Sequence, residues 1–149
     1  ANACKAGASV LVEEIRKAGG DWKPVGTLVI GTVSGDIHDI GKTLVATLFE
    51  ASGFNVVDLG VNIEPEGFVE AVRNHRPDVL GLSSLLTTTM GEQKIVIEAL
   101  ERESLRAAVK VLVGGGAVSR DWAREIGADG FGENAQEAVC AAKALLGLS

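Results

Sequence analysis

Short apolar runs alternate with amphipathic stretches along the chain, and this alternation predicts the fold class. Residues 27–33 (TLVIGTV) form a continuous apolar run of the length expected for a buried strand. Residues 44–49 place apolar side chains at helical spacing, and Gly53 follows as a helix stop. By the same criteria we expect strands over residues 27–33, 55–59, 79–83, 110–113 and 129–131, and helices over residues 40–52, 65–74, 88–102, 119–126 and 135–146.

Strand and helix therefore alternate along the whole of this region. Such a pattern is typical of an α/β protein in which a parallel sheet carries helices on both faces. Five strands favour the flavodoxin-like or Rossmann-like order 2-1-3-4-5. In this order the chain reverses direction between strands 1 and 3, which opens a crevice at their carboxyl ends. We expect a ligand there, beside the loops 34–41, 84–89 and 114–116.

A further helix is predicted ahead of the first strand, over residues 3–18. Small and apolar residues follow one another there along a single helical stripe, and Gly19-Gly20 ends the helix. The sheet does not require this helix. It either covers an edge of the sheet or belongs to another part of a larger protein.

Composition and charge exclude several classes of protein. Of the 149 residues, 46% are apolar and 23% charged, as in globular domains rather than in disordered or coiled-coil chains. The net charge of −6 argues against nucleic-acid binding, and no apolar run is long enough to span a membrane. The first residues lack the basic-then-apolar layout of a signal peptide, so we expect a cytoplasmic protein.

The loop after the first strand holds the residues most typical of a chemical site. It places His38 two residues after Asp36. A carboxylate in that position can accept a hydrogen bond from one ring nitrogen and aim the other lone pair outward, as around metal-ligating histidines. One such ligand is too few for zinc, but it suits a metal whose other positions a macrocycle fills. The alternative is an ordinary loop in which Asp36 or Asp39 caps the following helix.

Three short motifs together resemble a known family. They are Asp36-x-His38-x-x-Gly41, Ser83-x-Leu85 and Gly114-Gly115, separated by 41 and 28 residues. The motifs and their spacing resemble the cobalamin-binding (vitamin B12-binding) domains of corrinoid proteins from methyltransferase systems, with the cobalamin module of methionine synthase a close second. The resemblance covers roughly residues 25–147.

The resemblance implies a role for each motif. His38 would be the lower cobalt ligand, and Asp36 with Thr89 would form a relay behind it. Gly41, Gly114 and Gly115 would leave room for the nucleotide tail, because a Cβ would occupy the ligand's space. The full cofactor-binding set implied by the resemblance is Asp36, Ile37, His38, Asp39, Ile40, Gly41, Ser83, Leu85, Thr87, Thr89, Gly114, Gly115 and Gly132.

The resemblance also implies a methyl carrier that is not catalytic alone. The protein would hold a cobalamin or related cobamide (methylcob(III)alamin alternating with cob(I)alamin) base-off. It would shuttle a methyl group from a substrate-specific methyltransferase to a second methyltransferase, whose acceptor is a thiol or tetrahydrofolate, and a reductive activator would serve the same protein. Residues 25–149 would be the cobalamin-binding domain, and residues 1–20 the residual helix of an N-terminal helical cap domain.

Three alternatives stay open on the sequence alone. The first is the cobalamin subunit of an adenosylcobalamin mutase, whose loop tends to carry arginine where this chain has Ile40. The second is a cobalamin-dependent sensor, which would bring a DNA-binding module, although no basic segment is present here. The third is a cofactor-free flavodoxin-like signalling domain, which would need acidic residues where strand 3 ends in Ser83-Ser84.

Overall fold

Five parallel strands form the centre of the protein in the order β2-β1-β3-β4-β5, which confirms the predicted topology. The computed structural model describes residues 24–147. The strands are β1 (Thr27–Thr32), β2 (Asn55–Asp58), β3 (Val79–Ser83), β4 (Lys110–Gly114) and β5 (Gly130–Gly132). The helices are α2 (Ile40–Ala51), α3 (Pro65–His75), α4 (Gly91–Arg102), the short 3-10 helix η2 (Arg106–Ala108), α5 (Arg120–Ile126) and α6 (Ala135–Leu145).

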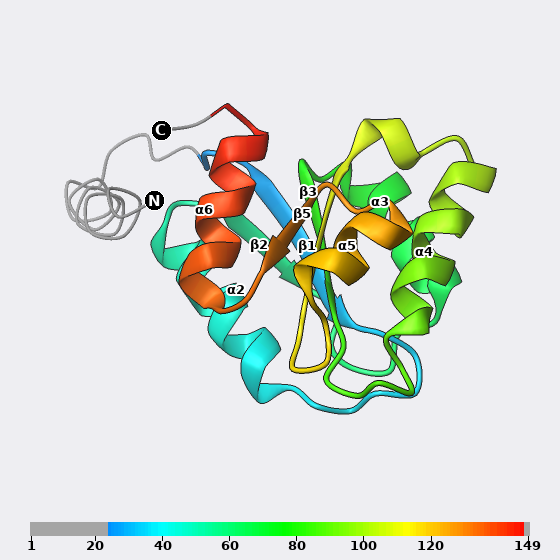
Figure 1. Ribbon diagram of the computed structural model, residues 1–149. Helices are drawn as coiled ribbons and strands as arrows, with labels where there is room; N and C mark the ends of the chain where they lie inside the picture. Colours follow the sequence, from blue (N-terminus) through cyan, green and yellow to red (C-terminus); the bar gives the residue numbers. More distant parts are fainter. Residues whose placement is uncertain (1–23, 148–149) are drawn as a thin grey trace, which may run out of the picture.

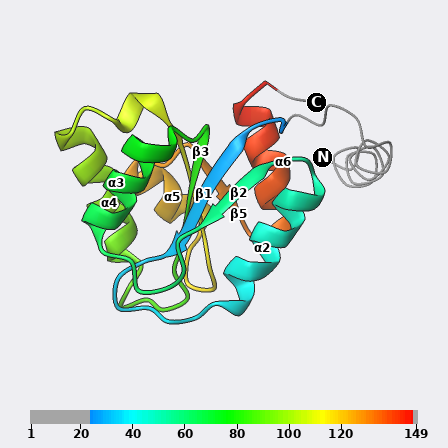
Figure 2. The same ribbon diagram turned by 180° about the vertical axis from the view of Figure 1, so that it is seen from behind.

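Helices cover both faces of the sheet (Figures 1 and 2). Helices α3, α4 and α5 pack on one face around a cluster that includes Phe68, Leu80 and Leu100. Helices α2 and α6 pack on the other face around Leu28 and Phe49. The central strands bury side chains on both faces, which explains why their sequences are continuous apolar runs rather than alternating ones.

The predicted elements are confirmed, with shifts of a few residues at their ends. Helix α4 begins at Gly91 instead of residue 88, because Thr89 sits in a turn in which its amide donates to the Leu86 carbonyl. The stops at Gly53 and Gly127 are confirmed, since both have a positive φ. The predicted helix 3–18 and the expected cap segment 1–20 lie outside the described residues.

Three loops meet at the carboxyl ends of the strands, at the lower edge of Figure 1. The register places Thr32 of β1 beside Ser83 of β3, and Ser83 beside Gly114 of β4. Gly114 in turn pairs with Gly132 of β5. Four strand ends therefore share one edge, although the sequence separates them by up to 100 residues. Within residues 24–147, no helix is long and apolar enough to cross a membrane.

Candidate functional site

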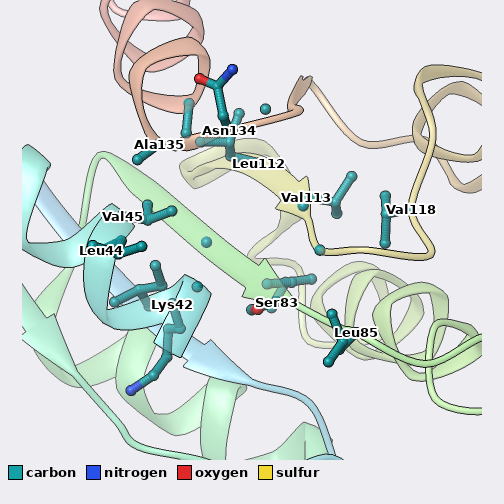
Figure 3. Close-up of a pocket in the computed structure, with 18 of the residues that line it drawn as sticks. Lys42, Leu44, Val45, Ser83, Leu85, Leu112, Val113, Val118, Asn134 and Ala135 are labelled. Atoms are coloured by element: carbon teal, nitrogen blue, oxygen red, sulfur yellow. The ribbon is translucent and has the colours of Figure 1, made fainter. Parts of the chain in front are cut away.

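A cavity of about 850 Å³ opens at this edge, between the sheet and the starts of α2 and α6 (Figure 3). Strands β1, β3 and β4 form its floor, and α2 and α6 form its sides. Of the residues expected to bind a ligand, ten line the cavity, namely Ile37, His38, Asp39, Ile40, Gly41, Ser83, Leu85, Gly114, Gly115 and Gly132. Asp36 and Thr89 lie behind the cavity wall, and Thr87 is exposed outside it.

His38 lies at the cavity with one side of its ring fixed. Its Nδ1 is 2.8 Å from Oδ1 of Asp36, and its backbone N–H donates to the same oxygen at 3.0 Å. The His38 side chain is about half exposed, and within residues 24–147 its Nε2 has no hydrogen-bond partner. The arrangement predicted from the sequence, with one nitrogen held and the other free, is therefore present within the described chain.

Asp36 is completely buried and accepts four hydrogen bonds. Besides the two from His38, the Leu85 backbone N–H donates at 2.8 Å and the Thr89 hydroxyl at 2.9 Å. Burial by itself would raise the pKa of Asp36, but the hydrogen bonds from His38, Leu85 and Thr89 outweigh it and hold the pKa well below its usual range. The Asp36 carboxylate is therefore ionised at neutral pH. It accepts hydrogen bonds from the ring and backbone of His38 and from the segment after β3.

The hydrogen bond expected between Thr89 and Asp36 is present, and a second hydroxyl group lies behind Thr89. The Thr89 hydroxyl lies 2.8 Å from the Ser84 hydroxyl, which is also completely buried. Ser84 takes this place because it follows the end of β3, where the chain turns back toward α4. Nothing in the sequence pattern separates Ser84 from the neighbouring Ser83.

The interpretation that Asp36 or Asp39 serves only as a helix cap does not fit the structure. Asp36 bonds to His38 and to the distant loop after β3. Asp39 occupies the N-cap position of α2, yet its carboxylate makes no capping bond to the helix backbone. It contacts instead the ammonium of Lys42 at 2.6 Å and the hydroxyl of Thr43 at 3.2 Å.

The structure requires a glycine at some positions of the site but not at others. A Cβ on Gly115, which has φ +129°, would lie 1.7 Å from the Ser84 carbonyl oxygen, and one on Gly132 would lie 2.7 Å from Ala138. The protein's own backbone therefore requires these two glycines. Within residues 24–147, no atom beyond its chain neighbours and its own helix lies within 4 Å of the position that a Cβ on Gly41 would take, so the described chain does not itself require a glycine there.

A buried amide that sequence reasoning missed holds two strand ends together from the opposite face. The Gln93 side chain has no exposed surface, and its nitrogen donates to the Leu82 carbonyl at 2.9 Å and to the Gly114 carbonyl at 3.3 Å. Its oxygen accepts from the indole N–H of Trp122 at 3.0 Å. Trp122 therefore has a packing role, whereas Trp22 lies outside the described residues.

The cavity has the volume and the apolar lining for a large ligand. Around its mouth Ile37, Ile40 and Leu44 are more exposed than apolar residues usually are in a folded domain. No group of three or more histidine, cysteine or acidic side chains within residues 24–147 could hold a metal ion by itself. A cobamide would bring its own cobalt, so it would require of the protein no more than the His38 imidazole and the apolar lining that this cavity offers.

Fold, motifs and cavity together define a vitamin B12-binding domain, and the chain belongs to this family. Residues 15–140 match the family model described as B12 binding domain. The cofactor is accordingly a cobalamin or a related cobamide. This assignment decides against the cofactor-free signalling domain.

Among individual proteins, the chain is 47% identical over 146 residues to dimethylamine corrinoid protein 2 of Methanosarcina acetivorans, with 98% of this chain and 67% of that protein covered. A crystal structure of a cobalamin-binding protein from Desulfitobacterium hafniense is 34% identical with a TM-score of 0.83, covering 92% and 65% of the two chains. A chain of the methanol:cobalamin methyltransferase complex of Methanosarcina barkeri is 36% identical with a TM-score of 0.80, covering 90% and 51%. The chain thus spans between half and two thirds of these proteins.

Proposed function

We propose that the protein is a methyl carrier, which holds a cobamide base-off with His38 as the lower cobalt ligand. The observation that carries this proposal is the His38 ring, which is fixed by Asp36 through Nδ1 and leaves Nε2 without a partner in the described chain. The relatives named for dimethylamine and for methanol:cobalamin methyl transfer support the carrier function over a mutase or a sensor.

One group of residues would ligate the cobalt, and another would bind the rest of the cofactor. When bound, the cobamide supplies the cobalt that takes up and gives away the methyl group. Asp36 keeps the Nδ1 proton of His38 in place, so that Nε2 carries the lone pair. Thr89 and Ser84 hold the carboxylate behind the ring. The apolar cavity beneath Gly41 receives the nucleotide tail and excludes water from it.

The proposed partners follow from the role of a carrier. A substrate-specific methyltransferase would load the methyl group, a second methyltransferase would remove it to a thiol or tetrahydrofolate, and a reductive activator would restore an oxidised cofactor. The apolar rim at Ile37, Ile40 and Leu85 would lie under the cofactor rather than face these partners. Residues 25–149 are proposed to suffice for cofactor binding, since the described cavity lies entirely within them.

Replacing His38 with alanine tests the ligand directly. We expect the Co(II) form of the bound cofactor to show an axial nitrogen splitting of three lines, which becomes two lines when the protein histidines carry ¹⁵N. His38→Ala should lose this isotope effect, measured by electron paramagnetic resonance. The chain has two histidines, and His75→Ala, at the exposed end of α3, is the matched control that should keep it. If the splitting keeps three lines when the protein histidines carry ¹⁵N, the nitrogen on the cobalt belongs to the cofactor's own base.

The carrier function itself is tested by methyl transfer. The chain is loaded with cobamide, reduced, and mixed with the methyltransferases encoded beside its gene and a ¹³C-methylated donor. We expect the label to reach the cofactor and then a thiol or tetrahydrofolate, followed by ¹³C nuclear magnetic resonance. Rearrangement of a carbon skeleton after loading with adenosylcobalamin, without any methyl transfer, would favour the mutase instead.

A further inference from the structure

A lysine next to the site is buried although the proposed chemistry does not use it. Lys42 lies in the first turn of α2 and is 2% exposed. Figure 3 shows its ammonium pointing away from the cavity, while its stem belongs to the cavity wall. Both burial and the positive end of the helix dipole oppose a cation in this position. The chain therefore needs a compensating arrangement around Lys42.

Two carboxylates supply the compensation. The Lys42 Nζ lies 2.6 Å from Oδ1 of Asp39 and 2.5 Å from Oδ1 of Asp58. Burial would lower the pKa of Lys42, but its hydrogen bonds to Asp39 and Asp58 outweigh burial and raise it, so the group stays charged. Asp58 ends β2 and also accepts from the Gly60 N–H at 2.9 Å. Asp39 directly follows His38.

The ion pairs complete a set of bonds around the backbone of His38. The His38 N–H donates to Asp36, and the His38 carbonyl accepts from the Thr32 hydroxyl at 3.0 Å. Both of these bonds tie the residue to β1 and its loop. Lys42 ties the next residue, Asp39, to the end of the neighbouring strand β2. Without the ammonium, Asp39 and Asp58 would be left as two like charges facing the same space.

We propose that Lys42 is a positioning residue, which bridges Asp39 to Asp58 and thereby fixes the loop that carries His38. This inference rests on the proposed ligand role of His38 for its functional meaning, whereas the bridge itself is a property of the cofactor-free chain. It assigns Lys42 a function beyond packing. Removing the ammonium should make the loop that carries His38 less ordered. Through this loss of order it should weaken cobalt ligation.

The test replaces Lys42 with methionine, which keeps the apolar stem and removes the charge. In the cofactor-free Lys42→Met chain, we expect hydrogen exchange of the His38 amide, which donates to Asp36, to become at least about tenfold faster. In the loaded chain, we expect the cobamide Kd to rise about tenfold and the ¹⁵N-histidine effect on the Co(II) spectrum to weaken. Asp58→Asn, which leaves Lys42 paired with Asp39, should give a smaller change in the same direction and serves if Lys42→Met does not fold.

Arg106→Met is the matched control at the other end of the sheet. Arg106 also bridges separate segments, with bonds to Asp129 at 2.9 Å and to the Gly127 carbonyl at 2.7 Å. Its removal should lower stability without changing hydrogen exchange of the His38 amide or cobalt ligation. If Lys42→Met behaves like this control, the inference is overturned. If the wild-type chain shows no histidine ligation, the proposed function fails, and exchange in the cofactor-free chain still decides the role of Lys42.

Discussion

Replacing Asp36 with asparagine is expected to lower the free energy of unfolding by about 3 kcal/mol and to weaken cobamide binding about 10- to 100-fold. Asparagine keeps the size of the side chain but turns one acceptor oxygen into a donor. Its NH₂ group would then face the Leu85 N–H and the Thr89 hydroxyl, or the two N–H groups of His38. Urea unfolding of the cofactor-free chain and titration with cobamide measure the two effects.

The same variant has an expected pH dependence. Because the folded pKa of Asp36 lies below that of an unfolded carboxyl group, its ionised form adds stability above about pH 4. The added stability is lost as the pH falls from there toward the folded pKa. The contribution of the ionised Asp36 carboxylate to the difference between wild type and Asp36→Asn should thus shrink below about pH 4. Asp129→Asn, a carboxylate at the amino end of the sheet that pairs with Arg106, should leave cobamide affinity unchanged.

Gly115→Ala and Gly41→Ala should have opposite effects although both glycines belong to the predicted site. Gly115→Ala places a methyl group against the Ser84 carbonyl at a positive φ, and we expect a loss of more than about 3 kcal/mol or failure to fold. Gly41→Ala meets no protein atom and adds a better helix former to α2, worth up to about 1 kcal/mol. Its cost should appear only in a raised cobamide Kd.

Urea unfolding and cobamide titration of the two variants separate these causes. A Gly41→Ala chain that binds cobamide as tightly as wild type would show that no part of the cofactor reaches this glycine. A Gly115→Ala chain of normal stability would show that the loops after β3 and β4 can separate without cost.

The sheet was predictable because its central strands are buried on both faces and because α2 and α5 are each followed by a glycine with a positive φ, Gly53 and Gly127. The contact between Asp36 and His38 was also predictable as one of two alternatives, since their spacing along one loop allows it. Thr89 could be placed only through the resemblance, because 53 residues separate it from Asp36. The sequence pattern did not indicate the side chains that contact the site region from other helices. Gln93 and Lys42 look like ordinary surface positions of amphipathic helices, and only the packed structure shows that each is buried and fully bonded.

The glycines show the same limit in another way. The family resemblance implies that Gly41, Gly114 and Gly115 surround a ligand, but the sequence does not show whether each glycine makes room for a ligand or for another part of the protein. The approach of Gly115 to Ser84 joins loops that lie some 30 residues apart, and no local pattern carries that information.

The bonds of Asp36 also constrain the order in which the protein assembles. Its partners Leu85 and Thr89 lie 49 and 53 residues further along the chain, beyond the complete helix–strand–helix–strand segment from α2 to β3. The loop after β1, which holds Asp36 and His38, cannot take its final form until β1 has paired with β3. Such long-range pairing is slow. A nascent chain that has not yet emerged past residue 89 lacks the loop that bonds to Asp36, and we therefore expect cofactor loading to follow folding of the sheet.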